Sequence, residues 1–417
     1  MQILSIKIDN TNVTKRDFIL MLCIIIISTE TLMFGTTSNG TFLAIRSFFN
    51  LSFLPLCLLH YKNNVNSNNL KPAKTALVLM IFLFSISGII SGELGLQYIY
   101  RMIIMAGGFY YAFTTPIKKF LNIFVIVMLF IATYSLIIAL LNTIVPGLFA
   151  FFPTIVNSGG YVYHNMIFTV IPENAEIIRL HGPFREPGVF VVYLSIALII
   201  YLKQTKLLSL YVLVIFVTAI ILSYSTTGYV VLNLIILYFI FKENIVEKRY
   251  IKCWILLLAA VVFGYLYLHT GILADDGIVL GKLNNENNAS RLSREASIFV
   301  NLDIIKSNYL FGVGIQHSFD IFKQYAGMIF VNDVSDNTNM WLQICAMHGI
   351  PFGFIFALGL FRFCMILSDN LQTLLFAVTG VFLLFCGETM IENILIYILI
   401  GYGFCYKKIE LNQEKVI

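Results

Sequence analysis

Apolar stretches of about 20 residues recur along almost the whole chain, and they constrain the fold more than any other feature. A helix needs roughly 20 apolar residues to cross the hydrocarbon core of a bilayer. Twelve stretches approach this length: 18–36, 40–60, 73–91, 96–115, 120–145, 187–202, 207–223, 228–241, 251–270, 346–367, 371–387 and 391–406. The sequence therefore predicts an all-α, polytopic integral membrane bundle of about 12 transmembrane helices, with residues 1–417 forming a single membrane domain.

The composition excludes a soluble globular domain. Hydrophobic residues make up 59% of the 417 and charged residues 12%, about half the share of a typical soluble protein. The net charge of +5 is carried by short basic clusters between apolar stretches, which are typical of topology signals. We therefore expect the chain to lie in a lipid bilayer and to bind no nucleic acid.

The distribution of Lys and Arg predicts the topology. If the amino terminus is cytoplasmic and all twelve stretches span, the inward segments contain 18 of the 27 basic residues and the outward segments contain seven. Both termini are then cytoplasmic. Two long loops, 146–186 and 271–345, then lie on the extracytoplasmic side. Long loops are often functional, and helical spacing of apolar residues from Ile298 to Tyr309 indicates amphipathic helices in the second one.

The seven cysteines lie in or beside apolar stretches and show no CxxC or His/Cys pattern typical of zinc sites. We therefore expect neither disulfides nor a metal site, and no cofactor.

Ionisable residues in and beside the apolar stretches fall at their outer ends. This holds for Glu30, Glu93, Arg46, Arg101, Glu388 and Glu392. Such residues are costly in a membrane and mark either function or a mutual pair. Their placement indicates a site open to the outer face, although Glu30 and Arg46 could also simply neutralise each other.

Polar motifs concentrate on the two long loops. The first loop ends in RLHGPFREPG (179–188), and LSYSTTGY (222–229) joins the next two outward helix ends. The second loop contains NASRLSRE (288–295), FGVGI (311–315) and DNTNMWLQICAMHGI (336–350). Gly312 and Gly314 are more typical of a tight loop than of a phosphate cradle.

In their order and spacing these motifs resemble the O-antigen polymerase and ligase superfamily, which assembles bacterial surface polysaccharide from lipid-linked oligosaccharides. The resemblance covers residues 179–360. It implies a GT-C-like, inverting glycosyltransferase in the bacterial inner membrane, acting on undecaprenyl-pyrophosphate-linked oligosaccharides. A chain-length regulator and a flippase are the further partners that it implies.

Polymerases (Wzy) and ligases (WaaL) of this superfamily share architecture and differ in acceptor. The ligase pattern has a His-Asn pair after the large loop, where this chain has Thr338 and Asn339. The difference favours a polymerase of O-antigen or capsular polysaccharide. We interpret His348, ten residues further on, as the entry to a span.

The implied reaction releases pyrophosphate, whose oxygens arginine binds through a planar fork of donors. Four outward arginines depart from the positive-inside bias. They form two pairs, Arg179 with Arg185 on the first loop and Arg291 with Arg294 on the second. The same residues could instead anchor the loops to lipid headgroups or neutralise Glu186 and Glu295. For the acceptor hydroxyl, Glu186, His181 and Asp336 are each able to accept the proton. The predicted catalytic residues are Arg185, Arg291, Arg294 and Glu186, and the predicted substrate-binding residues are Arg179, His181, Asp336, Asn339 and Arg101.

Three other functions remain open at this point. A transporter or flippase would have short loops and charged residues near the membrane midplane. A ligase would use the same donor with a different acceptor. A non-enzymatic assembly partner is the third alternative.

Overall fold

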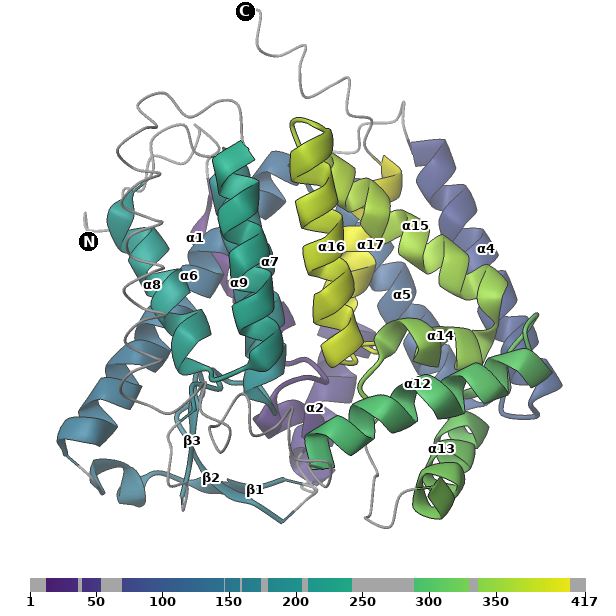
Figure 1. The fold of residues 1–417 in the computed structure, drawn as a ribbon, viewed down its shortest axis with the longest axis horizontal. Coiled ribbons are helices and arrows are strands. Elements are labelled where there is room, and N and C mark those ends of the chain that lie inside the picture. Colours follow the sequence, from purple (N-terminus) through teal and green to yellow (C-terminus); the bar gives the residue numbers. More distant parts are fainter. Residues whose placement is uncertain are drawn as a thin grey trace, which may run out of the picture.

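The computed structural model of the chain describes residues 13–36, 40–53, 70–145, 147–157, 160–173, 179–204, 209–241, 289–329 and 337–405. These residues form a helical bundle with a small sheet and two peripheral helices at one end (Figure 1). The expected span at 251–270 and the predicted site residue Asp336 lie outside the described ranges.

The bundle helices coincide with apolar stretches of the sequence. They are α4 (Leu70–Ile90), α5 (Leu96–Thr114), α6 (Ile117–Ile144), α7 (Pro187–Gln204), α8 (Leu210–Leu222), α9 (Thr226–Phe241), α15 (Ile350–Leu367), α16 (Leu371–Gly387) and α17 (Ile394–Cys405).

Among the described residues, α4, α6, α7 and α15 are long and apolar enough to cross a membrane. The helices α8, α9, α16 and α17 are apolar but shorter. The structure thus agrees with a helical membrane protein, and the number of 12 spans stays a prediction.

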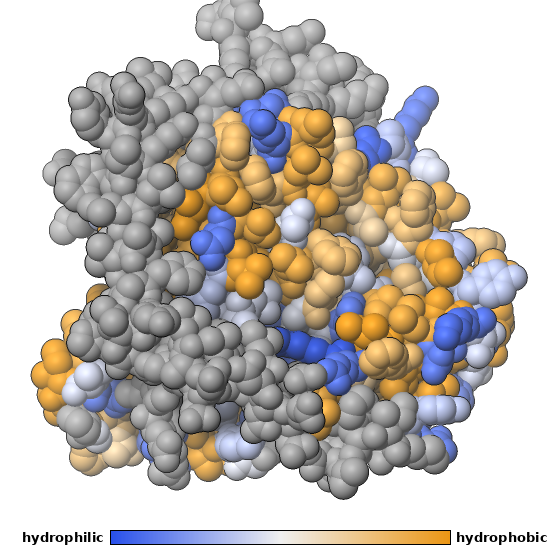
Figure 2. Space-filling view, in the orientation of Figure 1, coloured by the Kyte–Doolittle hydropathy of each residue, from blue (hydrophilic) through white to orange (hydrophobic). Residues whose placement is uncertain are grey.

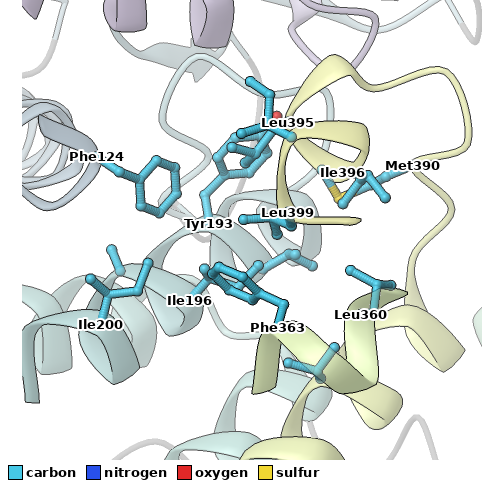
Figure 3. Packing of buried hydrophobic residues seen from close by; sticks show 14 of the residues in the cluster. Phe124, Tyr193, Ile196, Ile200, Leu360, Phe363, Met390, Leu395, Ile396 and Leu399 are labelled. Carbon is cyan, nitrogen blue, oxygen red and sulfur yellow. The ribbon is translucent and has the colours of Figure 1, made fainter. Parts of the chain in front are cut away.

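The centre of the bundle is formed by α7 and α17. Figure 3 shows side chains of α6, α7, α15 and α17 meeting there, with Phe124 and Tyr193 facing each other across α6 and α7. Glycines let the helices come close: a Cβ atom on Gly403 would lie 2.1 Å from the carbonyl oxygen of Gly359. Small residues at helix contacts are typical of membrane bundles, because they bring the backbones within van der Waals reach.

The stretch 18–36 is not one helix, so this expectation was wrong. Helix α1 (Lys15–Ile26) ends early, and the chain turns before the short π-helix η1 (Leu32–Thr36). The Thr31 hydroxyl donates to the carbonyl of Ile26 at 2.8 Å and stabilises the break. Glu30 lies within it. Helix α2 (Gly40–Phe48) and a second π-helix, η2 (Phe49–Phe53), follow.

The first long loop contains an antiparallel sheet, which corrects the all-α expectation. After a short 3-10 helix, η5 (Leu148–Phe151), the strands β1 (Thr154–Val156), β2 (Val162–Asn165) and β3 (Val170–Pro172) pair in this order. One cluster of buried side chains joins Ile155 and Tyr163 to Leu32, and another joins Ile171 to Ile138 of α6. The sheet is therefore packed onto the bundle.

The second long loop contains the expected helices, α12 (Ala289–Ser307) and α13 (Ile315–Ile329). A third helix, α14 (Met340–His348), precedes α15 and is separated from it at Gly349, whose φ is +85°. The expected span at 346–367 therefore begins at Ile350. In Figure 1, α12, α13 and the sheet lie at the same end of the bundle as the α8–α9 and α16–α17 connections.

Candidate active site

The motif RLHGPFREPG is held against the break after α1. Phe184 is fully buried and stacks on Tyr193 of α7 with ring centroids 4.4 Å apart. The backbone N–H of Leu32 donates to Pro183, and that of Arg185 donates to the Glu30 carbonyl at 2.9 Å. The segment containing Glu30 therefore fixes the position of Arg185.

The Arg185 guanidinium contacts two other segments and the neighbouring residue of its own. Its Nε donates to Glu30 Oε2 at 3.1 Å, its Nη2 donates to the carbonyl of Thr389 at 3.0 Å, and its Nη1 lies 3.5 Å from Glu186 Oε1. Burial alone would lower the pKa of Arg185, but the Glu30 and Glu186 carboxylates outweigh burial and raise the pKa above its ordinary value. Two of the five N–H donors are engaged by Glu30 and Thr389, so three remain for Glu186 and a ligand.

Arg185 lines a cavity of about 330 Å³ at the end of the bundle where α13 and α14 lie. Its walls come from the break after α1, from α2, α4 and α5, from α13 and α14, and from the segment before α17. The lining residues are Thr29, Glu30, Gly35, Arg46, Phe84, Arg101, Arg185, Ile315, Phe319, Asn337, Gln343, Met347, His348, Thr389, Ile391, Glu392 and Tyr397. Three arginines and two glutamates thus line one cavity, whose volume falls within the roughly 300–1,000 Å³ of small-molecule sites.

Arg101 and Arg46 each have a defined partner in the cavity wall, and Arg46 does not pair with Glu30. Arg101 of α5 pairs with Glu392, its Nε donating at 2.7 Å. Arg46 of α2 donates from Nη1 to the carbonyl of Phe34 at 2.9 Å. Because Glu30 pairs with Arg185 in the described structure, the alternative that Glu30 and Arg46 neutralise each other is wrong.

Arg179 and His181 hold the first loop and are absent from the cavity lining. Arg179 donates to the carbonyls of Ser223 and Tyr224, both at 3.1 Å, which joins RLHGPFREPG to the turn LSYSTTGY. The ring of His181 is buried against Tyr163. Burial and the nearby Arg179 charge lower the pKa of His181 to about 3, so the ring stays neutral and is a poor proton acceptor.

The two glycine-containing motifs of the second loop meet in space. The N–H groups of Val313 and Gly314 both donate at 3.0 Å, to the carbonyls of Ala346 and Met347. Gly312 and Gly314 have φ values of +68° and +88°, which L side chains rarely adopt. The tight loop predicted from these glycines is confirmed, and it brings the start of α13 to the end of α14.

Glu93, in the turn between α4 and α5, caps α13. Its carboxylate accepts backbone N–H donors from Ile315, Gln316 and His317 at 2.6 to 3.0 Å, and His317 Nδ1 lies 2.6 Å from Oε1. Burial alone would raise the pKa of Glu93, but these hydrogen bonds dominate and lower it. The cap fixes Ile315 at the edge of the cavity.

The position expected to distinguish ligase from polymerase has a structural role. The backbone N–H of Thr338 donates to Ser297 Oγ of α12 at 2.9 Å, and Asn339 caps α14 by accepting from the Leu342 N–H at 3.1 Å. Asn339 is buried and does not line the cavity, whereas its neighbour Asn337 does.

The remaining predicted residues lie beside the cavity or outside the described side chains. Glu186 is half exposed and points toward Arg185. Arg294 of α12 is partly buried and is one of the charges that act on Glu388. For Arg291 the structure describes its place in α12 but no side-chain contact. Figure 2 shows hydrophilic residues gathered between the lower end of α16 and α12 in this view, below an apolar face over α15 and α16.

Several cavity residues were not among the predicted site residues. Glu30, Arg46 and Glu392 carried a usable signal, since each is an ionisable residue at the outer end of an apolar stretch. Gln343, Met347 and His348 lie in the motif DNTNMWLQICAMHGI, but their place in the cavity wall depends on where α14 ends. Glu388 lies against Gly188 of α7, and burial together with the Glu186 charge raises the pKa of Glu388.

Comparison with protein families adds independent evidence. Residues 210–358 match the family described as O-antigen ligase (Wzy_C). The match supports the O-antigen polymerase and ligase superfamily, and with it a membrane enzyme of glycosyl-transfer type. It covers the α8–α9 turn, α12, α13 and α14, whereas Arg101, Arg185 and Glu392 lie outside it. Neither a curated protein nor a solved structure matches the chain.

Replacing Glu93 with Gln should loosen the first turn of α13. Loss of a helix cap costs about 0.5–2 kcal/mol, which corresponds to a roughly 2- to 30-fold increase in local opening. The folded pKa of Glu93 is depressed, so its stabilisation is present above the ordinary pKa of 4.5 and is lost as the pH falls through the lower folded value. Hydrogen-exchange protection of the 315–317 amides, compared between wild type and Glu93→Gln, should differ at pH 7 and converge in acid.

The matched control is Asp303→Asn, which removes a carboxylate from an exposed pair with Lys306 on α12. It should leave the 315–317 amides unchanged. Equal exchange of Glu93→Gln and wild type at pH 7 would contradict the capping role.

Proposed function

We propose that this chain polymerises undecaprenyl-pyrophosphate-linked repeat units of O-antigen or capsular polysaccharide by glycosyl transfer with inversion. The observation that carries the proposal is the placement of Arg185 on a cavity wall shared with Arg46 and Arg101. Three guanidinium groups around one cavity suit a ligand with several anionic oxygens.

The chemistry requires cationic groups for the leaving pyrophosphate and a proton acceptor for the attacking hydroxyl, both near the anomeric carbon. The acceptor hydroxyl attacks this carbon while the bond to the pyrophosphate oxygen breaks, so positive charge develops on the sugar and negative charge on the leaving group. Arg185 and Arg101 would stabilise the leaving pyrophosphate. Their own carboxylate partners hold both guanidinium groups in place before the ligand arrives, which favours preorganised electrostatic catalysis.

Glu186 is the best supported of the three proton acceptors named from the sequence. Its side chain is 51% exposed and adjoins Arg185, so an acceptor sugar can reach it. The enclosed, neutral His181 does not suit this role, and Asp336 lies outside the described residues. Arg294, and Arg291 one turn before it on α12, would approach the acceptor or the donor from the second loop.

The polymerase is preferred to the ligase because Thr338 stands where the ligase pattern has histidine. The ligase is kept as the second candidate, because the family matched by residues 210–358 is described as O-antigen ligase. A transporter is less favoured, because the arginines and glutamates that line the cavity lie at one end of the bundle and not near its middle.

We further propose that the cavity faces the outer side of the bacterial inner membrane and that both termini are cytoplasmic. The loop motifs and the cavity lie at one end of the bundle. The opposite end contains the start of α6, with Lys118 and Lys119, and the end of α7, with Lys203. Reporter fusions at Lys118 and Gln204 should give a cytoplasmic signal and a fusion at Asn284 a periplasmic one. An outward signal at Gln204 would contradict this topology.

Replacing Arg185 with Lys should abolish long glycan chains while the protein is still inserted at normal levels. Lysine keeps the charge but lacks the planar fork of arginine. Its compact ammonium group cannot bind Glu30, Thr389 and a phosphate oxygen together in the geometry of the guanidinium. Loss of one transition-state donor typically lowers the rate by about 100-fold or more. Cells lacking the native gene should then display single repeat units, since a ligase still attaches unpolymerised donors.

The measurement compares surface-glycan ladders of wild type, Arg185→Lys and Arg185→Ala at equal membrane abundance. Arg362→Lys is the matched control, because Arg362 lies over the Phe404 ring and outside the cavity lining. A wild-type ladder from Arg185→Lys would reduce Arg185 to a structural anchor. Loss of all surface glycan, single units included, would indicate the ligase or a flippase.

A further inference from the structure

Three cavity-lining residues each have a buried polar atom without a hydrogen-bond partner among the described residues. These atoms are Nε of Arg46, Nη1 of Arg101 and Oε1 of Gln343. They come from α2, α5 and α14, which are far apart in the sequence. Buried polar atoms are normally paired, so three unpaired ones around one cavity indicate a ligand that supplies the missing partners.

Gln343 is the most enclosed of the three. Its side chain is 3% exposed, and it lies one helical turn before Met347 on the same face of α14. Its backbone N–H donates to Asn339 within the helix, so the backbone of this turn is already satisfied. A glutamine amide both accepts and donates, and Gln343 belongs to the cavity wall that α14 forms.

The three atoms differ in what they require. The two arginine N–H groups need acceptors, which phosphate oxygens supply. The amide oxygen of Gln343 needs a donor, and a pyrophosphate has none when ionised. A sugar supplies such a donor through a hydroxyl group or through the N–H of an acetamido group. The cavity therefore suits a phosphate and the sugar attached to it.

We propose that Gln343 determines specificity for the first sugar of the donor, by accepting a hydrogen bond from a hydroxyl or acetamido N–H of the sugar joined directly to the pyrophosphate. This inference rests on the proposed function, because it takes the arginine side of the cavity to hold the pyrophosphate. A site built to bind a polar group of its substrate can reject an analogue that lacks the group by about 10⁴- to 10⁵-fold.

The test uses the full chain in lipid nanodiscs and two probes. One is the lipid-linked repeat unit that accumulates in cells lacking the gene, and the other is undecaprenyl pyrophosphate, which has no sugar. Wild type should bind the sugar-bearing lipid at least about 10-fold more tightly. Gln343→Leu should lose this preference while its affinity for undecaprenyl pyrophosphate stays unchanged. Gln343→Glu, which keeps an acceptor oxygen, should retain part of it.

The matched control is Gln316→Leu, the same substitution on the exposed face of α13, where the amide donates to Asp320. It should bind both probes as wild type does. The thermal midpoint of each variant in nanodiscs shows whether it is folded, and Gln343→Met serves as a second apolar variant if Gln343→Leu does not fold.

Two results would overturn the inference in different ways. If Gln343→Leu keeps the preference for the sugar-bearing lipid, or loses affinity for both probes equally, Gln343 does not contact the sugar and the proposed function stands. If wild type binds neither probe, the proposed function fails and the inference fails with it. Comparing undecaprenyl-pyrophosphoryl N-acetylglucosamine with the corresponding glucose lipid assigns the donor to an acetamido N–H or a hydroxyl.

Discussion

The ion pair between Arg185 and Glu30 is the interaction on which the site depends. It joins the break after α1 to the loop before α7, and the bond from Arg185 to Thr389 adds the segment between α16 and α17. An enclosed charge that loses its partner costs about 3–5 kcal/mol, so each of these groups needs the other. The cavity wall is therefore fixed by charge pairing among segments that the helices alone do not hold together.

A second set of contacts positions the wall contributed by the second loop. Glu93 caps α13, and the glycines of FGVGI let this segment run beside the end of α14. Ile315, Gln343 and Met347 are thereby brought to the cavity from a part of the chain that lies more than 200 residues after Glu93 in the sequence. The first loop contributes through Arg185, while its small sheet and Arg179 brace the loop against the bundle.

Much of the helical bundle could be predicted from hydropathy, because a membrane helix is recorded locally in about 20 consecutive residues. The break at Glu30 could not, since it depends on a threonine hydroxyl that competes for a helix carbonyl. The sheet in the first loop was missed because its strands are three or four residues long and are stabilised by packing on Leu32 and α6.

The site likewise combines residues that the sequence identifies with pairings that depend on the tertiary structure. Arg185 and Arg101 were predicted from charge and position, and both line the cavity. The pairing of Glu30 with Arg185 rather than Arg46 could not be read from the sequence, because proximity along the chain favoured the nearer arginine. Arg179, His181 and Asn339 were selected for their chemistry, but their hydrogen bonds and packing are those of residues that hold the loops in place.

The most direct test of the account is a cryo-electron microscopy structure of the full chain in nanodiscs with undecaprenyl pyrophosphate bound. We expect the pyrophosphate in the cavity, with its oxygens within hydrogen-bond distance of Arg185 and Arg101, and the Arg185–Glu30 pair intact. A pyrophosphate bound elsewhere on the protein, with the cavity occupied by lipid chains or by α13, would contradict the central claim.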